Sequence, residues 1–498
     1  MPNTLAYIVV FSYPLVVLLL FRKLSLPKAL IWSILGGYLF LPEKTGIDLP
    51  VLPVLDKSTI PALSAAVMVW LKRERPDPVK ARQERSEEPG RTAGRPVRVR
   101  RQGGRLMVLL LLMVIIAPFA TYYFNREPVI WGPTFLPAMR LYDSFSMVLS
   151  TFMVLIPFLL ARKQLATPEA HREVLKAFVW AGLVCSLLIL IEVRLSPQLN
   201  RWIYGFFPHS FAQHIRSGGF RPILFLEHGL RVGIFMSMAV LSACVLYRAQ
   251  DGKQPGLWGF AAIWLLIVLF LSKTLGAFAI TLMLAPVLLF LKPRLATLIA
   301  AVFAGVVLLY PMARGSGIIP LDSVASAAES ISAERAGSFV YRLNNEEALL
   351  DRANLKPVFG WGMWYRNGLF NEYGRRTSVT DGTWIIEIGV RGWAGYLGFF
   401  GLLTLPIILL AFRARQLALD GVTAGLMIIL AANLVDLIPN SSLVPITWMI
   451  AGALAGRYEL GGQISPVGDP VPPRRRQIER KAAPATTRRA PSGRPLRN

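Results

Sequence analysis

Long apolar runs recur along this chain, and they restrict its fold more than any other feature. A helix needs about 20 mostly apolar residues to cross the hydrocarbon core of a bilayer. Runs near this length appear throughout the 498 residues, of which 54% are hydrophobic and 17% are charged. Unbroken apolar backbone in lipid must be helical, because every N–H and C=O has to be paired within the segment. The sequence therefore predicts an all-α, polytopic membrane protein.

Thirteen segments have the composition of membrane spans, and the second, third, twelfth and thirteenth of them are short. They lie near residues 4–21, 28–42, 58–71, 106–124, 139–160, 173–193, 223–247, 257–271, 275–291, 295–312, 383–411, 422–437 and 442–456. They group into N-terminal spans in 1–71, further spans in 106–312 and C-terminal spans in 383–456. The first run has no basic segment before it and no cleavage motif after it, so we expect a span and not a cleaved signal.

Two basic segments account for much of the net charge of +25. Residues 72–105 carry twelve Lys and Arg against five acidic residues, and residues 457–498 carry ten against three. Both are rich in Pro, Gly, Arg and Ala, and we expect them to be disordered. Neither interleaves aromatic residues with its charges, so nucleic acid is not an expected partner. Basic loops that stay in the cytoplasm explain them best, and contact with anionic membrane lipids is an alternative.

The basic connections also predict the orientation of the chain. Arg and Lys gather on alternate connections between the thirteen segments, together with the basic tail. Basic loops stay in the cytoplasm, so this pattern places all of them on one side, with the N-terminus periplasmic and the C-terminus cytoplasmic. These basic connections are Arg22–Lys23, 72–105, Arg162–Lys163, Arg248–Lys253, Lys292 with Arg294, and Arg413 with Arg415.

Two connections on the other side are long, and long loops often carry function. One spans residues 194–222. The other, 313–382, is a large external loop with eight basic and eight acidic side chains. Within it, Val340, Leu343 and Leu349–Leu350 have the spacing of a short amphipathic helix, which Pro357 and the following glycine turn would end.

Motifs of soluble enzymes are missing from the sequence. It contains no P-loop, no HExxH, no paired CxxC and no GxSxG, and no D-x-D pair occurs in an external loop. Cys185 and Cys244 lie inside apolar runs and are expected in the core. We therefore expect no cofactor and no metal site. An external enzyme also meets no ATP or nucleotide-sugar, so its substrate must carry its own activation, as a lipid pyrophosphate does.

Four cationic residues lie where the external loops meet the membrane: Arg216, Arg221, Lys273 and Arg342. A charge at a membrane edge is costly without a partner. Guanidinium groups form forked hydrogen bonds to phosphate oxygens, and lysine acts as a point charge. Together they suit a diphosphate leaving group. The alternative is that they anchor the chain at the interface, which we favour for Arg221 taken alone, and Lys273 could equally cap a tight hairpin.

Three stretches resemble motifs of the O-antigen ligase/polymerase superfamily. RSGGFRPILFLEHG (216–229) is similar to that family's Arg-x-x-Gly-x-Phe stretch, and LSKTLGAFAITLM (271–283) to its Ser-Arg hairpin, with Lys273 in place of the arginine. YRLNNEEALLDRANLKPVFGWGMW (341–364) with TDGTWIIEIGVRGWAGYLGFF (380–400) resembles its large loop, glycine turn and following span. The resemblance covers residues 170–410.

The resemblance implies a membrane glycosyltransferase of the bacterial inner membrane that needs no cofactor. Such enzymes take a glycan from undecaprenyl pyrophosphate and pass it to another lipid-linked unit or to lipid A core. Arg342, Arg216, Arg221 and Lys273 would bind the pyrophosphate, and Arg342 and Arg216 would stabilise its growing charge. An acid would orient or deprotonate the acceptor hydroxyl, with Asp381, Glu346 and Glu347 as alternatives. The implied partners are lipid-linked oligosaccharides, membrane lipids, and a chain-length regulator and flippase of the same pathway.

One departure from the family favours a polymerase of O-antigen, capsule or exopolysaccharide over a ligase. Ligases carry a histidine late in the large loop, where this chain has Val379–Gly382, and its histidines are at 171, 209, 214 and 228. We expect His209 and His214 to be loop residues and His228 to form a buried hydrogen bond between helices. A third interpretation is a transporter that flips lipid-linked glycans, but such proteins usually hold ionisable residues at mid-span and show internal repeats.

Overall fold

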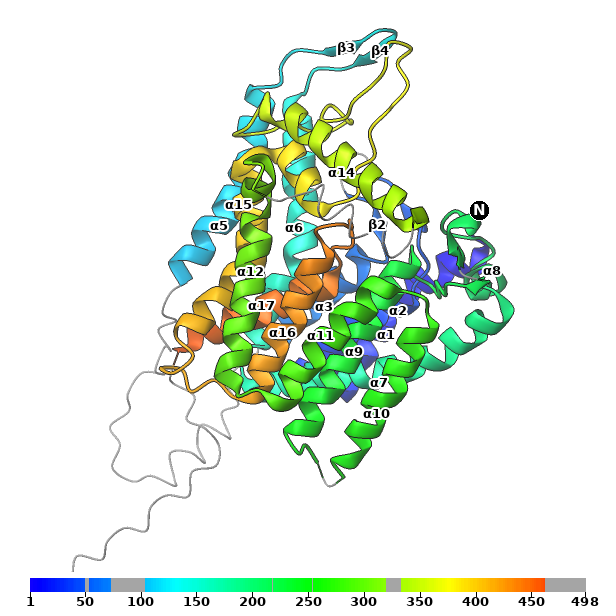
Figure 1. The fold of residues 1–498 in the computed structure, drawn as a ribbon, viewed down its shortest axis with the longest axis vertical. Coiled ribbons are helices and arrows are strands. Elements are labelled where there is room, and N and C mark those ends of the chain that lie inside the picture. Colours follow the sequence, from blue (N-terminus) through cyan, green and yellow to red (C-terminus); the bar gives the residue numbers. More distant parts are fainter. Residues whose placement is uncertain (50–52, 73–103, 217, 253, 319–332, 462–498) are drawn as a thin grey trace, which may run out of the picture. The chain divides into compact units, whose positions relative to one another are not determined.

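The computed structural model describes residues 1–49, 53–72, 104–216, 218–252, 254–318 and 333–461 (Figure 1). Most of this part of the chain is helical. Its strands form three short antiparallel hairpins outside the helices, namely β1 (Gly46–Ile47) with β2 (Leu55–Asp56), β3 (Val129–Trp131) with β4 (Thr134–Leu136), and β5 (Ile215–Arg216) with β6 (Gly219–Phe220).

A helix forms at each of the thirteen predicted segments. They are α1 (Thr4–Lys23), α2 (Leu26–Phe40), α3 (Thr59–Leu71), α5 (Gly104–Tyr123), α6 (Leu141–Gln164), α7 (Pro168–Leu195), α9 (Gly229–Arg248), α10 (Gly256–Leu271), α11 (Leu275–Phe290), α12 (Pro293–Gly315), α15 (Thr383–Phe412), α16 (Gly421–Asp436) and α17 (Pro445–Leu460). The connections add α8 (Leu199–Tyr204), the 3-10 helix η1 (Phe211–His214) and α14 (Ala333–Asn354).

Seven of these helices are long and apolar enough to cross a membrane: α1, α5, α6, α7, α9, α12 and α15. Five shorter apolar helices, of 13 to 16 residues, accompany them. Several present a continuous apolar face outward. On α10, for example, Leu257, Phe260, Ile263, Ile267 and Phe270 are all at least half exposed. A soluble protein rarely exposes such a stripe, so lipid must cover it. The prediction of an all-α polytopic membrane protein is confirmed.

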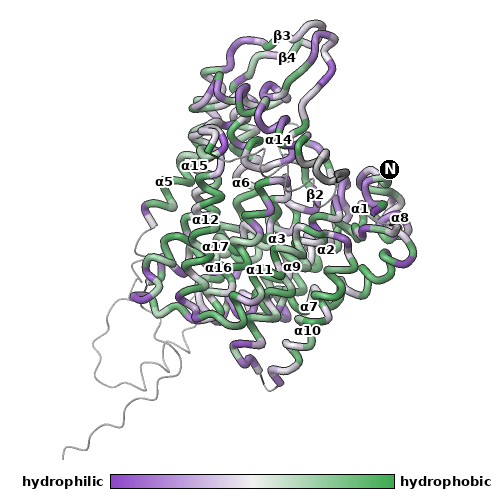
Figure 2. Tube along the Cα trace, viewed as in Figure 1, coloured by the Kyte–Doolittle hydropathy of each residue, from purple (hydrophilic) through white to green (hydrophobic). Residues whose placement is uncertain are grey.

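The core forms around α9, whose apolar window is 89% buried. It packs against α7, α10, α11 and α16, and Phe235 on α9 meets Phe178 on α7 edge to face. A second group joins α5, α12 and α15, and α6 packs along α17. Figure 2 shows hydrophobic residues along the helices and hydrophilic residues gathered in the loops beside the β3–β4 hairpin and around α14. The polar chemistry of the chain therefore lies outside the apolar bundle.

The long connections gather on one side of the bundle, which we call the long-loop side. Four hydrogen bonds join these connections to one another. The α7–α9 connection accepts one from the α2–α3 connection, Lys57 Nζ to the Phe225 carbonyl (2.9 Å), and one from the α10–α11 connection, Lys273 Nζ to the Arg216 carbonyl (2.8 Å). Arg366 Nη2 of the α12–α15 connection donates to the Glu127 carbonyl of α5–α6 (2.8 Å), and Thr383 Oγ1 at the start of α15 donates to the Asn440 carbonyl of α16–α17 (3.0 Å). The start of the chain belongs to this side as well, since the Asn3 amide donates to the Tyr204 carbonyl (2.9 Å).

The alternate connections gather on the opposite side, which we call the basic side. Arg248 Nη1 at the end of α9 donates to the Leu288 carbonyl at the end of α11 (2.9 Å). Arg457 Nη2 near the end of α17 donates to the Leu417 carbonyl in the α15–α16 connection (2.9 Å), and Arg162 at the end of α6 forms an ion pair with Glu459 of α17 (2.7 Å). The chain thus starts on the long-loop side and its last described helix ends on the basic side, as an odd number of crossings requires.

The large loop 313–382 contains the predicted amphipathic helix. It is α14, which buries Leu343, Leu349 and Leu350 and ends three residues before Pro357. After α14, Arg366 is almost fully buried and donates to the carbonyls of Trp361, Pro137 and Glu127 at 3.1, 2.6 and 2.8 Å. These hydrogen bonds connect the part of the large loop after α14 to the α5–α6 connection, which contains the β3–β4 hairpin.

The span predicted at 383–411 forms as α15, but it is not one unbroken helix. Gly392 has φ +64° and ψ −171°, which breaks α15 into two helices. The turn at 357–362 fills this break, because the Trp393 amide donates to the Pro357 carbonyl (2.8 Å) and the Gly362 amide to the Val390 carbonyl (2.9 Å). A Cβ on Gly360 would lie 2.5 Å from the Gly392 nitrogen. Glycine at both positions therefore lets the loop dock into the helix.

The predicted span 223–247 begins later than expected, at Gly229. Residues 223–228 are extended or turned, because Glu192 of α7 accepts hydrogen bonds from the amides of Ile223 and Leu224, each at 2.8 Å. A third amide, that of Leu199, donates to the same carboxylate at 3.0 Å. This carboxylate anchors the stretch that leads into α9. The predicted disordered segments 72–105 and 457–498 fall almost entirely outside the described residues.

Candidate functional site

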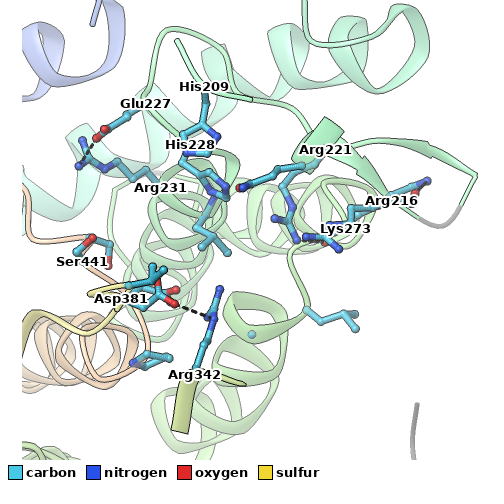
Figure 3. A pocket seen from close by; sticks show the side chains of 18 of the residues that line it. His209, Arg216, Arg221, Glu227, His228, Arg231, Lys273, Arg342, Asp381 and Ser441 are labelled. Atoms are coloured by element: carbon cyan, nitrogen blue, oxygen red, sulfur yellow. Dashed lines mark hydrogen bonds and ion pairs between the residues drawn. The ribbon is translucent and has the colours of Figure 1, made fainter. Parts of the chain in front are cut away.

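A cavity of about 940 Å³ opens on the long-loop side among four connections (Figure 3). Those connections are α7–α9, α10–α11, α12–α15 and α16–α17. Its charged lining consists of five basic side chains and two carboxylates: Arg216, Arg221, Arg231, Lys273, Arg342, Glu227 and Asp381. All four predicted phosphate-binding cations are among them. The fold therefore brings together residues that lie as far as 126 positions apart, from 216 to 342.

The β5–β6 hairpin holds Arg216 and Arg221 at one wall of this cavity. Arg216 pairs with Gly219 in the hairpin, and Gly218 completes the turn with φ +70°. Lys273 Nζ donates to the Arg216 carbonyl at 2.8 Å, and Arg221 Nη2 donates to the Lys273 carbonyl at 3.5 Å. A side chain on Gly219 would collide with the Lys273 ammonium. Glycine at position 219 thus leaves room for Lys273 to lie against the hairpin.

Lys273 occupies the tight turn between α10 and α11, as one of the two interpretations of its sequence predicted. Its φ of +56° lies in the left-handed region, which a residue other than glycine seldom adopts. Such strain persists only where the surroundings over-determine it. Here the hydrogen bond to the Arg216 carbonyl holds the ammonium beside the cavity. The turn and the cationic site are therefore the same feature.

Arg342 and Asp381 face the cavity from the middle and from the end of the large loop. Arg342 lies in the middle of α14 and Asp381 lies two residues before the start of α15, and Arg342 Nε is 3.3 Å from Asp381 Oδ2 (Figure 3). About a third of each side chain is exposed. The pair uses Nε, so the two Nη groups of Arg342 can point to a ligand. A planar fork held this way suits a phosphate.

The other two predicted acids lie away from the cavity. Glu346 is buried one turn further along α14, where its carboxylate is 3.5 Å from the Tyr310 hydroxyl. Burial raises the pKa of Glu346 to about 7, against the opposing effect of the Arg314 charge. Glu347 is exposed and pairs with Arg314 at 3.3 Å. Of the three alternatives for an acceptor-binding acid, only Asp381 lines the cavity.

Glu227 and Arg231 are cavity residues that the sequence analysis missed. They form an ion pair at 2.6 Å, and Arg231 also lies 3.7 Å from Glu43. Glu43 in turn pairs with buried Lys57 at 3.0 Å. The predicted span placed 227–231 inside the membrane, which hid this site. The spacing Glu-x-x-x-Arg at its start was the available signal, since residues four apart meet on a helix.

Neutral polar groups complete the lining. Asn440, Ser441 and Ser442 of the short α16–α17 connection face the same cavity. Ser442 Oγ donates to Asp436 Oδ2 at 2.6 Å, and Asn440 Nδ2 donates to Asp436 Oδ1 at 2.9 Å. The sequence analysis did not identify this turn, because its residues carry no charge pattern. Amides and hydroxyls of this kind can bind sugar hydroxyl groups.

The expectation for His228 is wrong, because it does not bond between helices. Its Nδ1 accepts from the Leu230 amide at 3.1 Å and thereby caps the start of α9. His209 and His214 lie in the connection before α9, as predicted for loop residues. Within the described ranges, these three histidines are the group of potential metal ligands that comes together, with ligand atoms within 4.8 Å of one another.

The cavity is suited to bind a ligand that carries a polyanionic group next to sugar hydroxyl groups. Five cations against two carboxylates leave it positive. No family model matches this sequence, and a search of the curated proteins finds no match. Fold and site together thus define a class: a polytopic all-α membrane protein with a cationic cavity among the connections on one side of its bundle.

Proposed function

We propose that this protein is a polymerase of the O-antigen ligase/polymerase kind, which joins lipid-linked oligosaccharide units on the periplasmic face of a bacterial inner membrane. One observation carries the proposal. Four cations picked from three separate sequence motifs, Arg216, Arg221, Lys273 and Arg342, line one cavity, together with the carboxylate of Asp381. Interfacial anchors would have no reason to converge in this way.

The distribution of charge supports the proposed orientation. Basic connections remain in the cytoplasm, and in this chain they gather opposite the cavity. The cavity and the N-terminus then lie in the periplasm and the C-terminus in the cytoplasm. A periplasmic site meets polyprenyl pyrophosphates as activated donors, which agrees with a cavity of cations.

In the proposed reaction the acceptor hydroxyl attacks the anomeric carbon of the donor glycan. The new C–O bond forms as the bond to the pyrophosphate oxygen breaks, and the lipid pyrophosphate leaves with the electron pair. Arg342 and Arg216 stabilise the charge that grows on this leaving group. Asp381 accepts or orients the proton of the acceptor hydroxyl. Its pairing with Arg342 places base and leaving-group site side by side.

A reconstituted reaction tests this proposal. Protein purified in detergent is mixed with a lipid-pyrophosphate oligosaccharide, and the products are resolved by length while released lipid pyrophosphate is measured. We expect a ladder of longer glycans and release of one lipid pyrophosphate for each bond formed. Asp381→Asn should lose the ladder. Glu372→Gln serves as a matched control, because Glu372 is exposed in the same loop and outside the cavity lining.

The alternatives give different results in the same preparation. Lipid-pyrophosphate release that depends on added lipid A core, with no ladder, would assign a ligase. Movement of the intact substrate across proteoliposome membranes without any release would assign a transporter. Either result would refute the polymerase proposal.

A further inference from the structure

His209, His214 and His228 meet beside the cavity although 19 positions separate the first from the last. Their ring centroids lie 5.9 Å apart for His209 and His214, 4.8 Å for His209 and His228, and 5.0 Å for His214 and His228. His209 and His228 line the cavity, and His214 lies behind them, fully buried. The three rings therefore form a compact group with access to the cavity on one side.

His214 provides an independent sign of a ligand. Its side chain has 0% exposure, and neither of its ring nitrogens forms a hydrogen bond. The backbone of Arg221 approaches the ring and favours its charged form, but not at hydrogen-bonding geometry. Nδ1 of His209 is likewise buried and unbonded. Buried polar atoms in native proteins are nearly always paired, so an imidazole left this way marks a binding position.

The surroundings keep His214 and His228 neutral, which is the form of imidazole that binds metals. Burial, with the charge of Arg221 and the neighbouring His209, lowers the pKa of His214 to about 4. Burial, with the neighbouring His214 and His209, lowers the pKa of His228 to about 3. Neutral imidazoles suit zinc, copper, iron and nickel among the divalent first-row metals.

We propose that His209, His214 and His228 bind one Zn²⁺ ion, with a fourth coordination position open to the cavity. Tetrahedral Zn²⁺ with bonds of 2.0–2.1 Å needs ligand nitrogens about 3.4 Å apart. The ligand nitrogens of the three histidines lie within 4.8 Å of one another, so the widest separation must shorten by roughly 1.4 Å. Rotation of the two partly exposed rings, His209 and His228, supplies this movement. The sequence analysis expected no metal because these histidines follow no recognised zinc motif.

Two features oppose the ion and predict its behaviour. Arg221, Arg216 and Arg231 are close enough to lower histidine pKa values, so they also repel a cation. Arg231 also has a close counter-charge, the carboxylate of Glu227, at 2.6 Å. His228 must also release the Leu230 amide if it binds through Nε2, because Nδ1 then carries the proton. The site should therefore bind more weakly than a closed structural zinc site, and an anion at the fourth position should strengthen it.

The ion would help to position the β5–β6 hairpin, which carries Arg216 at the edge of the cavity. His209 and His214 precede the β5–β6 hairpin that carries Arg216, and His228 begins α9. A metal shared by the three would fasten this hairpin to the end of a buried helix. The proposal does not depend on glycosyl transfer, since it concerns only metal binding by the free protein.

Direct binding measurements test the site. The full chain is purified with a tag that lacks histidine, and Zn²⁺ uptake is measured by equilibrium dialysis with elemental analysis. We expect one Zn²⁺ per chain, and Co²⁺ in its place should show the visible absorption of a tetrahedral complex. His214→Phe keeps an aromatic ring but removes both nitrogens, and it should weaken binding by more than ~10-fold.

Two further variants separate ligand loss from misfolding. His209→Ala changes a partly exposed ring and should weaken binding in the same way. His171→Gln should leave uptake unchanged, because His171 lies at the start of α7 and both of its ring nitrogens have partners, Thr423 and the Ala453 carbonyl. Monodispersity and thermal stability are compared for all variants. Uptake well below one ion per chain, or equal uptake in wild type and His209→Ala, would overturn the proposal.

Discussion

Arg342 offers the sharpest test of the cavity, through its replacement by lysine and by alanine. Lysine keeps the positive charge and can still approach Asp381, but it loses the planar fork of hydrogen-bond donors. Alanine removes both. If Arg342 only anchored α14 at the membrane interface, lysine would replace it almost fully, because its ammonium reaches the interface equally well. If the guanidinium binds a diphosphate in bidentate fashion, lysine and alanine should both fail.

The structure predicts a large effect on activity and a small effect on stability. The Arg342–Asp381 pair is 37% and 33% exposed, and partly exposed ion pairs contribute at most ~1 kcal/mol. Removing a donor to charge that grows in a transition state costs ~10²–10³ in rate, or about 2.7–4 kcal/mol. Activity should therefore fall by ~10²–10³, while the protein remains folded.

The assay follows the release of lipid pyrophosphate by purified protein at matched concentration, with thermal unfolding measured in parallel. Arg375→Lys is the matched control, because Arg375 is exposed in the same loop and does not line the cavity. It should retain the wild-type rate. Wild-type activity in Arg342→Lys, with normal stability, would refute bidentate phosphate binding and leave Arg342 the role of an interfacial anchor.

Three further predictions concern topology, packing and pH. A membrane-impermeant maleimide applied to intact cells should label Tyr373→Cys in the large loop and spare Gln250→Cys on the basic side, and the reverse labelling would invert the orientation. Gly392→Ala forces a Cβ into a backbone conformation that only glycine adopts readily, so it should destabilise the protein by about 1–3 kcal/mol, measured as a lower unfolding temperature in detergent. The pKa of Glu346 rises from 4.5 to about 7 on folding, so the folded chain binds the extra proton between these values. Stability should fall as the pH rises through this window, by up to ~3 kcal/mol, and Glu346→Gln should remove most of that dependence.

The sequence by itself determined the class of the fold. A bilayer requires each spanning segment to be apolar and helical over its own length, and this requirement is local. Thirteen apolar segments could therefore be identified one at a time, and a helix lies at each of them. The period of Leu343, Leu349 and Leu350 likewise identified α14, because amphipathic spacing is a property of one helix.

Local patterns failed where two distant segments share one structure. The break in α15 at Gly392 depends on the turn at 357–362, whose amides and carbonyls pair with the exposed backbone of the helix. The delayed start of α9 depends on Glu192, which belongs to the preceding helix. No residue within either predicted span indicates these distant partners. Both predicted spans therefore continued through apolar residues that are not helical in the structure.

The chemistry of the cavity was decided only by the tertiary structure. Residue types marked Arg216, Lys273 and Arg342 as possible phosphate ligands, but their convergence needs four connections to fold over one end of the bundle. The same packing buried Glu346 and left Asp381 facing the cavity. Burial and distance between charges depend on every neighbour in space, whereas the membrane's demand for apolar helices acts on each segment separately.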